Sequence, residues 1–132
     1  MTTTNIKQQL FARLADVGKA LANGNRLELL ELLAQKERSV EILAGLAGLS
    51  VANTSQHLQH LRRAGLITAR KQERHVFYAI AGDDVLALMI AMRQTAEKNF
   101  AEMSRLIEGY LVSRDSLEPV SRAELTDRMR EG

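Results

Sequence analysis

The sequence predicts a mainly α-helical fold with one small β-hairpin. Of its 132 residues, 45% are apolar and only one is a proline, which is typical of a globular domain with a buried core. Apolar residues recur at spacings of three and four along most of the chain, the period of an amphipathic helix. Alternating, β-rich residues occur mainly in one segment, residues 66–80, so the expected sheet is a single hairpin.

The first two expected helices span about residues 5–22 and 27–33. The first has an apolar stripe made of Ile6, Leu10, Leu14, Val17 and Leu21. The sequence Asn-Gly-Asn at 23–25 breaks this pattern. The second helix carries five leucines nearly all round, so we expect it to be buried. A polar turn is expected at 36–38.

Two further short helices are expected on either side of Gly48. Ser39 is the expected N-cap of the third helix, and Ser50 that of the fourth, which runs to about Ala64 with Gly65 after its C-cap. The inward residues expected on the third helix are Ile42, Leu43, Leu46 and Ala47. Those expected on the fourth are Thr54, Leu58 and Leu61.

The second half of the chain predicts a hairpin and a long helix. Residues 66–71 and 75–80 are the expected strands, and 72–74 the turn. A helix is then expected from Asp83 to about Val112, and at about 1.5 Å per residue it would be about 45 Å long. A domain of this size cannot easily cover the apolar stripe of such a helix. Pairing with a second copy of the chain is the simplest cover.

The expected organisation is one domain over residues 5–112, followed by a linker and a short C-terminal helix over 113–132. The linker ends at Pro119, and Ser121 with Glu124 fits a capping box that opens the short helix.

Composition excludes several classes of protein. The chain has no cysteine, which excludes disulfides and zinc–thiolate sites on it. No apolar run approaches the roughly 18 residues of a membrane span, and residues 1–20 hold no signal-peptide stretch, so we expect a cytoplasmic protein with no membrane partner. No Gly-rich phosphate loop, His-Glu-x-x-His motif or cysteine nucleophile occurs. We therefore expect neither an enzyme nor a bound cofactor.

Positive charge is concentrated in one third of the chain. Residues 50–80 carry five Lys or Arg against one acid, whereas residues 83–112 carry three against five. This asymmetry favours a polyanionic partner, with a solvated basic face as the alternative. The helices on either side of Gly48 form a candidate helix-turn-helix. Its second helix has a polar face rich in amide and imidazole groups, which can read base edges in the major groove of duplex DNA.

The candidate DNA contacts lie on that second helix and on the hairpin after it. They are Ser50, Ala52, Asn53, Ser55, Gln56, His57, Gln59, His60, Arg63, Arg70, Lys71, Arg74 and His75. Asn53 and Gln56 have the clearest chemical reason, because amide side chains pair with adenine. Cations on the hairpin can neutralise phosphates without reading sequence. His57 could equally be packed against the core, and Gln59 and His60 could simply be solvated.

Several motifs in register resemble the ArsR/SmtB family of bacterial winged-helix repressors. They are Leu49-Ser50, Ser55-Gln56-His57-Leu58, Leu61-Arg62 and Ala64-Gly65-Leu66-Ile67, within a resemblance that covers about residues 10–111. The resemblance implies a homodimeric repressor that an inducer releases from operator DNA, and two-fold symmetry implies a near-palindromic operator. It also implies that the first and last helices of the domain form the dimer interface. The expected interface residues are Leu10, Leu14, Val17, Leu88, Met92, Phe100, Met103 and Ile107.

The chain departs from that family at its metal sites. The family's two-cysteine motif falls on Ser39-Val40-Glu41, and no histidine follows His75 to complete the other common site on the last helix. Metal sensing is therefore not expected, and a small-molecule inducer is possible. Residues 119–132 resemble the opening of a rhodanese-like sulfurtransferase domain. The alternatives to a repressor are a protein-interaction module and a regulatory fragment of a sulfurtransferase fusion.

Overall fold

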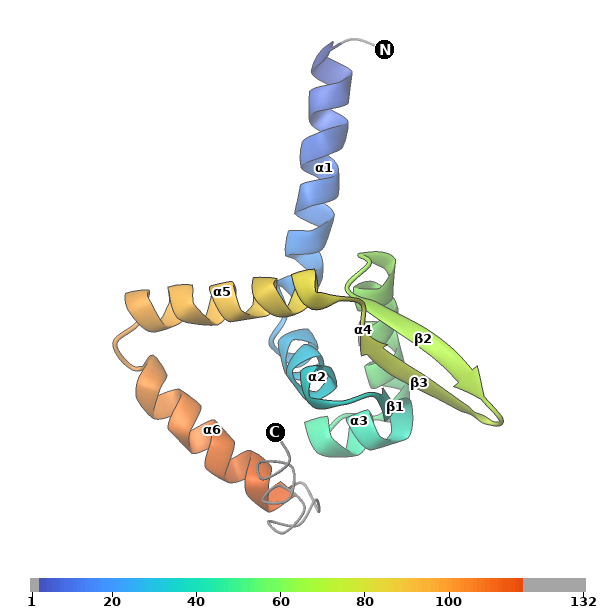
Figure 1. The fold of residues 1–132 in the computed structure, drawn as a ribbon, viewed down its shortest axis with the longest axis vertical. Coiled ribbons are helices and arrows are strands. Elements are labelled where there is room, and N and C mark those ends of the chain that lie inside the picture. The colour runs from blue at the N-terminus through green and yellow to red at the C-terminus, as the bar shows by residue number, and fades with distance from the viewer. Residues whose placement is uncertain (1–2, 118–132) are drawn as a thin grey trace. The chain divides into compact units, whose positions relative to one another are not determined.

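A computed structural model describes residues 3–117 of the chain, which divides into two compact units at Leu88/Met89. The first unit contains α1 (Thr3–Leu21), α2 (Gly24–Gln35), β1 (Arg38–Ser39), α3 (Val40–Ala47), α4 (Val51–Arg63), β2 (Ile67–Gln72), β3 (His75–Ile80) and the beginning of α5 (Asp83–Asn99) (Figure 1). The second unit contains the rest of α5 and α6 (Met103–Leu117). The expected linker end at Pro119, the capping box and the rhodanese-like segment lie outside the described residues.

Leucines of α2, α3 and α4 form the core of the first unit. Leu29, Leu30, Leu43, Leu58 and Leu61 are fully buried, and each contributes about 1.5–3 kcal/mol relative to an exposed side chain. The expectation of a buried second helix is confirmed. The inward stripe expected on the fourth helix is also confirmed, because Thr54 is fully buried together with its two leucines. The hydroxyl of Thr54 donates to the Ser50 carbonyl at 2.8 Å.

The ends of α3 and α4 follow the expected capping residues. The hydroxyl of Ser39 accepts a hydrogen bond from the Ile42 amide at 3.4 Å, and that of Ser50 accepts one from the Asn53 amide at 3.0 Å. Gly48 ends α3 at φ 69° and Gly65 follows α4 at φ 78°, a left-handed conformation that favours glycine.

The expectation that Ile42 points inward from α3 is wrong. Ile42 is 53% exposed, whereas Leu43 and Ala44 are buried. The eight-residue helix buries only a narrow face against α2 and α4. Each residue turns about 100° around a helix axis, so the position before Leu43 points to solvent.

A three-stranded antiparallel sheet replaces the simple hairpin. Strands β2 and β3 pair as expected, and the pairing of Gln72 with His75 leaves a two-residue turn whose first residue, Glu73, has φ 55°. The polar turn expected at 36–38 is wrong for its last residue, Arg38, which belongs to a strand. Arg38 and Ser39 form β1, which pairs with the outer edge of β3. Two residues are too few to show the alternation by which a strand is recognised.

Arg38 is a buried cation that joins β1 to the end of α2. It is 4% exposed. Its Nε donates to the Leu32 carbonyl at 3.0 Å, and its Nη2 to the Gln35 side-chain oxygen at 2.9 Å. A positive charge is favoured there because the carbonyls at a helix C-terminus carry partial negative charge.

The single long helix expected from Asp83 to Val112 is also wrong, because the chain leaves the helical conformation between α5 and α6. The Thr95 hydroxyl donates to the Ala91 carbonyl, and the Asn99 amide donates to the Thr95 carbonyl, both at 2.7 Å. Such side-chain bonds compete with the helical ladder. The last α-helical bond runs from the Phe100 amide to the Ala96 carbonyl, and a tighter turn to Met103 follows. The apolar period continues through the break, so periodicity alone does not reveal it.

The Arg26 side chain connects three helices of the first unit. Its Nε and Nη2 donate to the carbonyls of Ala20 and Lys19 at the end of α1, at 2.6 and 2.8 Å. Its Nη1 lies 3.5 Å from Nδ1 of His57 on α4. The Arg26 backbone amide donates to the side chain of Asn23, the N-cap of α2, at 3.1 Å.

The same corner lowers the pKa of His57 below its ordinary value. Burial of the imidazole is the largest cause, followed by the positive charges of Arg26 and His60. His57 is half-buried. Its surroundings therefore resemble those of a packed side chain, the alternative to a DNA contact.

We expect Arg26→Gln to lower the free energy of unfolding by about 1.5–3 kcal/mol. One hydrogen bond from a charged donor has this value when it is shielded from water, as the part-buried bond to the Ala20 carbonyl is, whereas the bond to the Lys19 carbonyl is exposed and contributes little. Urea unfolding followed by circular dichroism measures the loss. Arg13→Gln is the control, because an exposed pair on α1 contributes at most about 1 kcal/mol. Equal losses in the two variants would contradict the connecting role of Arg26.

We expect the stability of the protein to fall on acidification in a way that depends on His57. Because the folded pKa is lowered, the unfolded chain takes up the proton first as pH falls below about 6.5. Stability present above that pH is therefore lost as pH falls toward the folded pKa. Urea unfolding at about pH 7.5 and pH 5.5 should show a smaller loss for His57→Gln than for the wild type. His75→Gln, on the exposed hairpin, should keep the wild-type loss.

Candidate nucleic-acid interface

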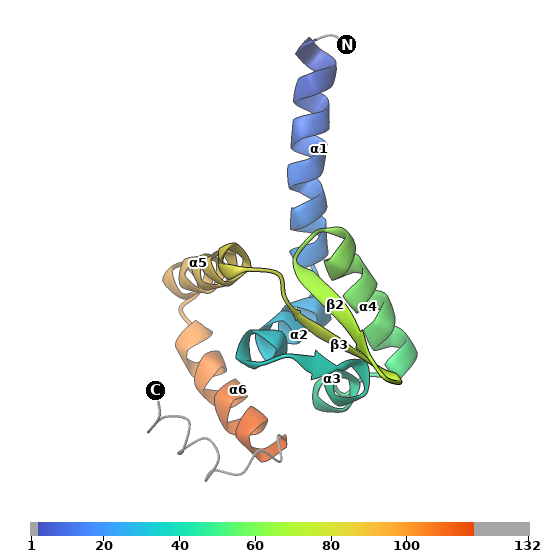
Figure 2. The same cartoon turned by 45° about the vertical axis from the view of Figure 1, so that its right-hand side comes forward.

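Helix α4 lies at the surface of the first unit beside the β2–β3 hairpin (Figure 2). Its buried stripe, Thr54, Leu58 and Leu61, fixes the rotation of the helix about its axis. The opposite side is therefore turned to solvent, and no acidic residue occurs between 50 and 63. This surface combines amide, hydroxyl and cationic groups that can bond base edges and phosphates.

The predicted contact residues on α4 fall into two groups. The exposed ones are Ser50, Ala52, Asn53, Gln56, His60 and Arg63, and the half-buried ones are Ser55, His57 and Gln59. Ser50 uses its hydroxyl oxygen as a cap. His57 is directed toward Arg26. The exposed amides among the predicted contacts on α4 are therefore those of Asn53 and Gln56.

Val51 is a residue of this surface that the sequence reasoning missed. It lies in the first turn of α4 and is 47% exposed. An apolar group beside polar ones can contact the methyl group of thymine. Val51 is apolar and therefore does not belong to the polar pattern from which the contacts were predicted. Only its exposure in the fold reveals it.

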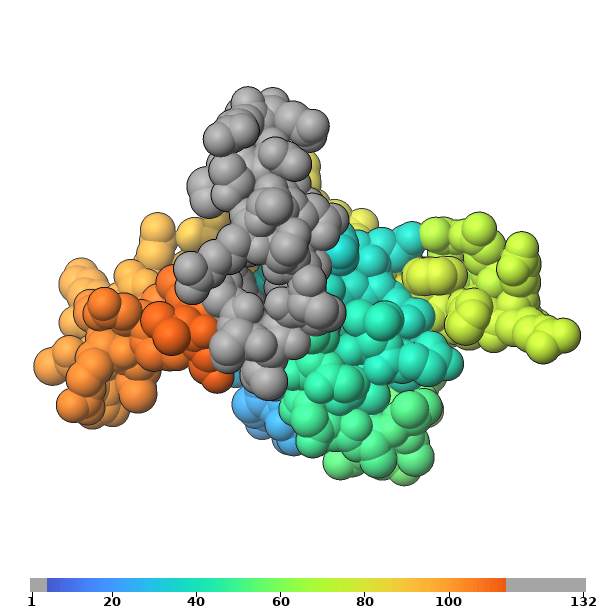
Figure 3. Space-filling model, turned by 90° about the horizontal axis from the view of Figure 1, so that it is seen from below, coloured from blue at the N-terminus to red at the C-terminus, as the bar shows by residue number. Residues whose placement is uncertain are grey.

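The tip of the hairpin is a second exposed basic element. In Figure 3 the hairpin, in yellow-green, projects from the body formed by α2, α3 and α4. Lys71, Arg74 and His75 are exposed there. Within residues 3–117, neither Lys71 nor Arg74 forms an ion pair. Both are free to neutralise phosphates.

Arg70 is engaged within the protein, unlike the other predicted cations of the hairpin. Its Nε donates to Oε2 of Glu37 at 2.8 Å, and its Nη2 contacts Oε1 of the same carboxylate. Its guanidinium carbon lies 4.8 Å from the centre of the Phe77 ring. Hydrogen bonding from Arg70 lowers the pKa of Glu37, and the same bond raises the pKa of Arg70. Arg70 therefore ties the hairpin to the segment before β1.

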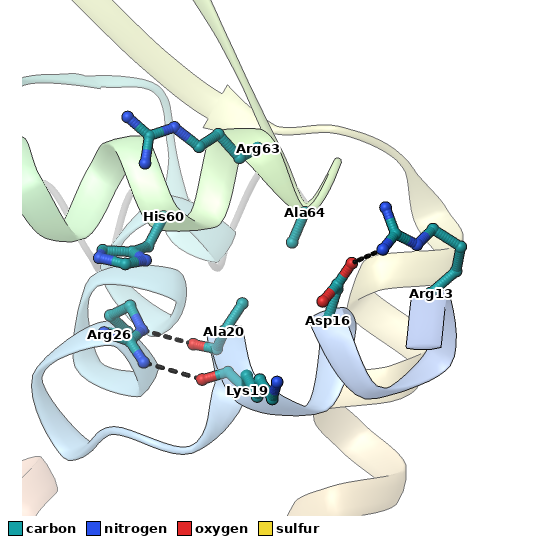
Figure 4. Close-up of a pocket in the computed structure, with 8 residues that line it drawn as sticks. All are labelled: Arg13, Asp16, Lys19, Ala20, Arg26, His60, Arg63 and Ala64. Atoms are coloured by element: carbon teal, nitrogen blue, oxygen red, sulfur yellow. Dashed lines mark hydrogen bonds and ion pairs between the residues drawn. The ribbon is translucent and has the colours of Figure 1, made fainter. Parts of the chain in front are cut away.

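A hollow of about 440 Å³ lies between α1, α2 and the end of α4 (Figure 4). It is lined by Arg13, Asp16, Lys19 and Ala20 of α1, Arg26 of α2, His60 and Arg63 of α4, and Ala64, which follows α4. Two residues predicted as DNA contacts, His60 and Arg63, thus border a basic hollow shared with α1. The one carboxylate of the lining, Asp16, pairs with Arg13 at 3.1 Å.

Apolar side chains are exposed on α1 and on the second unit. On α1, Ile6, Leu10, Phe11 and Leu14 are each 56–57% exposed. Phe100 of the second unit is 58% exposed. Of the other residues expected at a dimer interface, Leu88 is exposed, and Val17, Met92, Met103 and Ile107 are half-buried. Exposed apolar faces of this kind mark interaction surfaces. The sequence stripe omitted Phe11.

No three histidine or carboxylate side chains within residues 3–117 come together in a way that could hold a metal ion. The helices of that part of the chain also include none long and apolar enough to cross a membrane.

Comparison with known proteins identifies the family. Residues 23–69 match the family described as bacterial regulatory protein, arsR family. HTH-type transcriptional regulator Rv0324 of Mycobacterium tuberculosis is 39% identical over 126 residues, which is 96% of this chain and 55% of that protein. The chain therefore spans about half the length of this relative.

Solved structures show the same fold. A winged helix-turn-helix DNA-binding domain from Mycobacterium bovis, Mb0332, described as homodimeric and as a possible ArsR-family regulator, superposes with TM-score 0.70 at 40% identity. The match covers 76% of this chain and 93% of that one. Rv0081 of M. tuberculosis superposes with TM-score 0.66 at 35% identity, over 70% of this chain and 94% of that one.

The expected fold, a mainly helical winged helix-turn-helix, is confirmed by these matches and by the sheet beside α4. The chain belongs to the ArsR family of bacterial regulatory proteins, and its described part has the winged helix-turn-helix fold of these solved domains.

Proposed function

We propose that this protein is a homodimeric repressor that binds a near-palindromic operator and leaves it when a signal not read by cysteine thiolates binds. The observation that carries the proposal is the acid-free, exposed face of α4 beside an exposed basic hairpin tip. A protein that acts on operator DNA in a bacterium works in the cytoplasm.

Helix α4 reads the sequence in this proposal. An α-helix fits the major groove, and the residues near its N-terminus contact the bases. Asn53 and Gln56 lie in the first half of α4 and are exposed. Either amide can form a bidentate pair with adenine. The N-terminus of the helix also favours a nearby phosphate because of its partial positive charge.

The hairpin contributes affinity that does not depend on sequence. Lys71 and Arg74 would neutralise phosphates beside the groove. Arg70, held by Glu37 and Phe77, would instead fix the direction in which the hairpin projects.

A second copy of the chain would cover the exposed apolar faces. The interface would use Leu10, Leu14 and Val17 of α1 with residues of α5 and α6, over a DNA-binding and dimerisation domain of residues 5–112. Support comes from the exposure of the α1 face and from the homodimeric M. bovis domain. Two-fold symmetry would place half-sites about 34–36 Å apart, or a multiple of that distance.

Fluorescence anisotropy tests the proposal with the DNA upstream of the protein's own gene and a scrambled duplex of equal length. We expect a preference of about a thousandfold or more for the upstream DNA. A reporter driven by that DNA should be more active in a strain without the protein. Equal, weak binding to both duplexes together with an unchanged reporter would favour a protein-interaction module.

We expect Gln56→Ala to weaken binding to the operator by about 1–3 kcal/mol and binding to the scrambled duplex hardly at all. The amide makes its bonds only with the correct base. Titration of both duplexes at one salt concentration measures the difference. An equal loss of affinity for both duplexes would show that Gln56 does not contribute to sequence recognition.

We expect Arg74→Ala to weaken binding to every sequence alike and to reduce the slope of log K against log salt by about 0.9, the value of one phosphate contact. Arg70→Ala should reduce the slope less, because the Arg70 charge already faces Glu37. Equal slope changes for the two variants would show that Glu37 does not occupy Arg70 in the complex.

A further inference from the structure

The hollow between α1 and α4 gathers cations from elements far apart in the sequence. Figure 4 shows Lys19 and Arg26 on one side and His60 and Arg63 on the other, with the methyl groups of Ala20 and Ala64 nearby. Arg26 of α2 donates to two carbonyls at the end of α1, and its Nη1 lies 3.5 Å from Nδ1 of His57 on α4. The cations therefore occupy related positions in a folded corner.

Little negative charge balances these cations. Asp16 pairs with Arg13, whereas Arg26 bonds neutral carbonyls and keeps its full charge. Within residues 3–117, Lys19 and Arg63 form no ion pair. The ends of α1 and α4 each supply a partial negative charge of about one half. The two helix ends therefore offset about one of the three positive charges of Lys19, Arg26 and Arg63, which leaves an excess of about two positive charges.

The positive potential of this corner affects a neighbouring group. Burial is the largest cause that lowers the pKa of His57, and the positive charges of Arg26 and His60 lower it further. A protonated imidazole is thus disfavoured there, and an anion is favoured for the same electrostatic reason.

The volume suits a small anion. The hollow of about 440 Å³ lies within the range of about 300–1,000 Å³ that small-molecule sites occupy. It is therefore larger than a single phosphate group needs, and its two alanine methyl groups could contact an attached organic part. Guanidinium and ammonium groups are the usual partners of phosphate.

We propose that the hollow between α1 and α4 binds a phosphate group, with Lys19 and Arg63 as its principal ligands. The phosphate belongs either to a free small molecule or to the backbone of bound DNA, and the two sources are separable by experiment. Lys19 was not among the predicted DNA contacts. With a free anion the inference goes beyond the proposed repressor function, because such a site needs no DNA; with a DNA phosphate it rests on that function.

Thermal unfolding with inorganic phosphate, against sodium chloride at equal ionic strength, tests the free-anion source. The variants are Lys19→Gln and Arg63→Gln, and the control is Lys7→Gln, which removes the same charge from an exposed position of α1 outside the hollow. Arg26 is left intact because it joins the helices. At phosphate about tenfold above its Kd, we expect Tm to rise by about 4 °C more in the wild type and Lys7→Gln than in the two variants.

Salt titrations of DNA binding with the same four proteins test the backbone source. If Lys19→Gln and Arg63→Gln each reduce the slope of log K against log salt by about 0.9 while Lys7→Gln does not, a DNA phosphate occupies the hollow. A specific effect of Lys19→Gln in either experiment supports the site. Equal responses of wild type, Lys19→Gln and Lys7→Gln in both experiments overturn it. The unfolding experiment contains no DNA, so failure of the repressor proposal leaves its result valid.

Discussion

The arrangement of the first unit depends on the guanidinium group of Arg26. One planar cation closes the C-terminal end of α1 through two carbonyls and contacts α4 through His57. Most of α1 is exposed along its length, so it has few other contacts with which to fix its direction. Because α1 carries an uncovered apolar face and α4 an uncovered polar one, the relation between these two surfaces is set by a few hydrogen bonds at their shared corner.

The polar surface of α4 is a consequence of how the helix is buried. Its three inward residues are fully buried, and rotation of the helix would expose them at a cost of about 1.5–3 kcal/mol for each leucine. The hydroxyl of Thr54 is satisfied inside the helix by the Ser50 carbonyl, so its burial leaves no unpaired donor. Core packing therefore determines which amides face outward, while the caps at Ser50 and Gly65 determine where the surface begins and ends.

Features with a local or periodic cause were predictable from the sequence. The caps at Ser39 and Ser50, the glycines after α3 and α4 and the β2–β3 hairpin each depend on residues close together in the chain. The strand β1 and the Glu37–Arg70 pair were not predictable, because each joins residues more than thirty positions apart. The break after Asn99 coincides with side-chain bonds to the helix carbonyls, which the apolar period does not record. For the candidate DNA-binding face, pattern and chemistry indicated helix α4, whose polar side is exposed, whereas the engagement of Arg70 and His57 required the fold. The contacts with DNA and with a second copy stay predictions.

Glu73 would limit how strongly the hairpin tip attracts DNA in the proposed complex. Its φ of 55° is a left-handed conformation that glycine adopts readily, whereas the backbone of a residue with a side chain is strained there by about 1 kcal/mol or more. Glu73 also adds one negative charge to a turn whose neighbours in the sequence, Lys71 and Arg74, are cations. The tip thus carries local backbone strain and less than its maximum positive charge. For a regulator proposed to dissociate on a signal, such restraint favours rapid exchange over permanent occupancy, and it marks position 73 as the place where affinity could be adjusted without altering the reading helix.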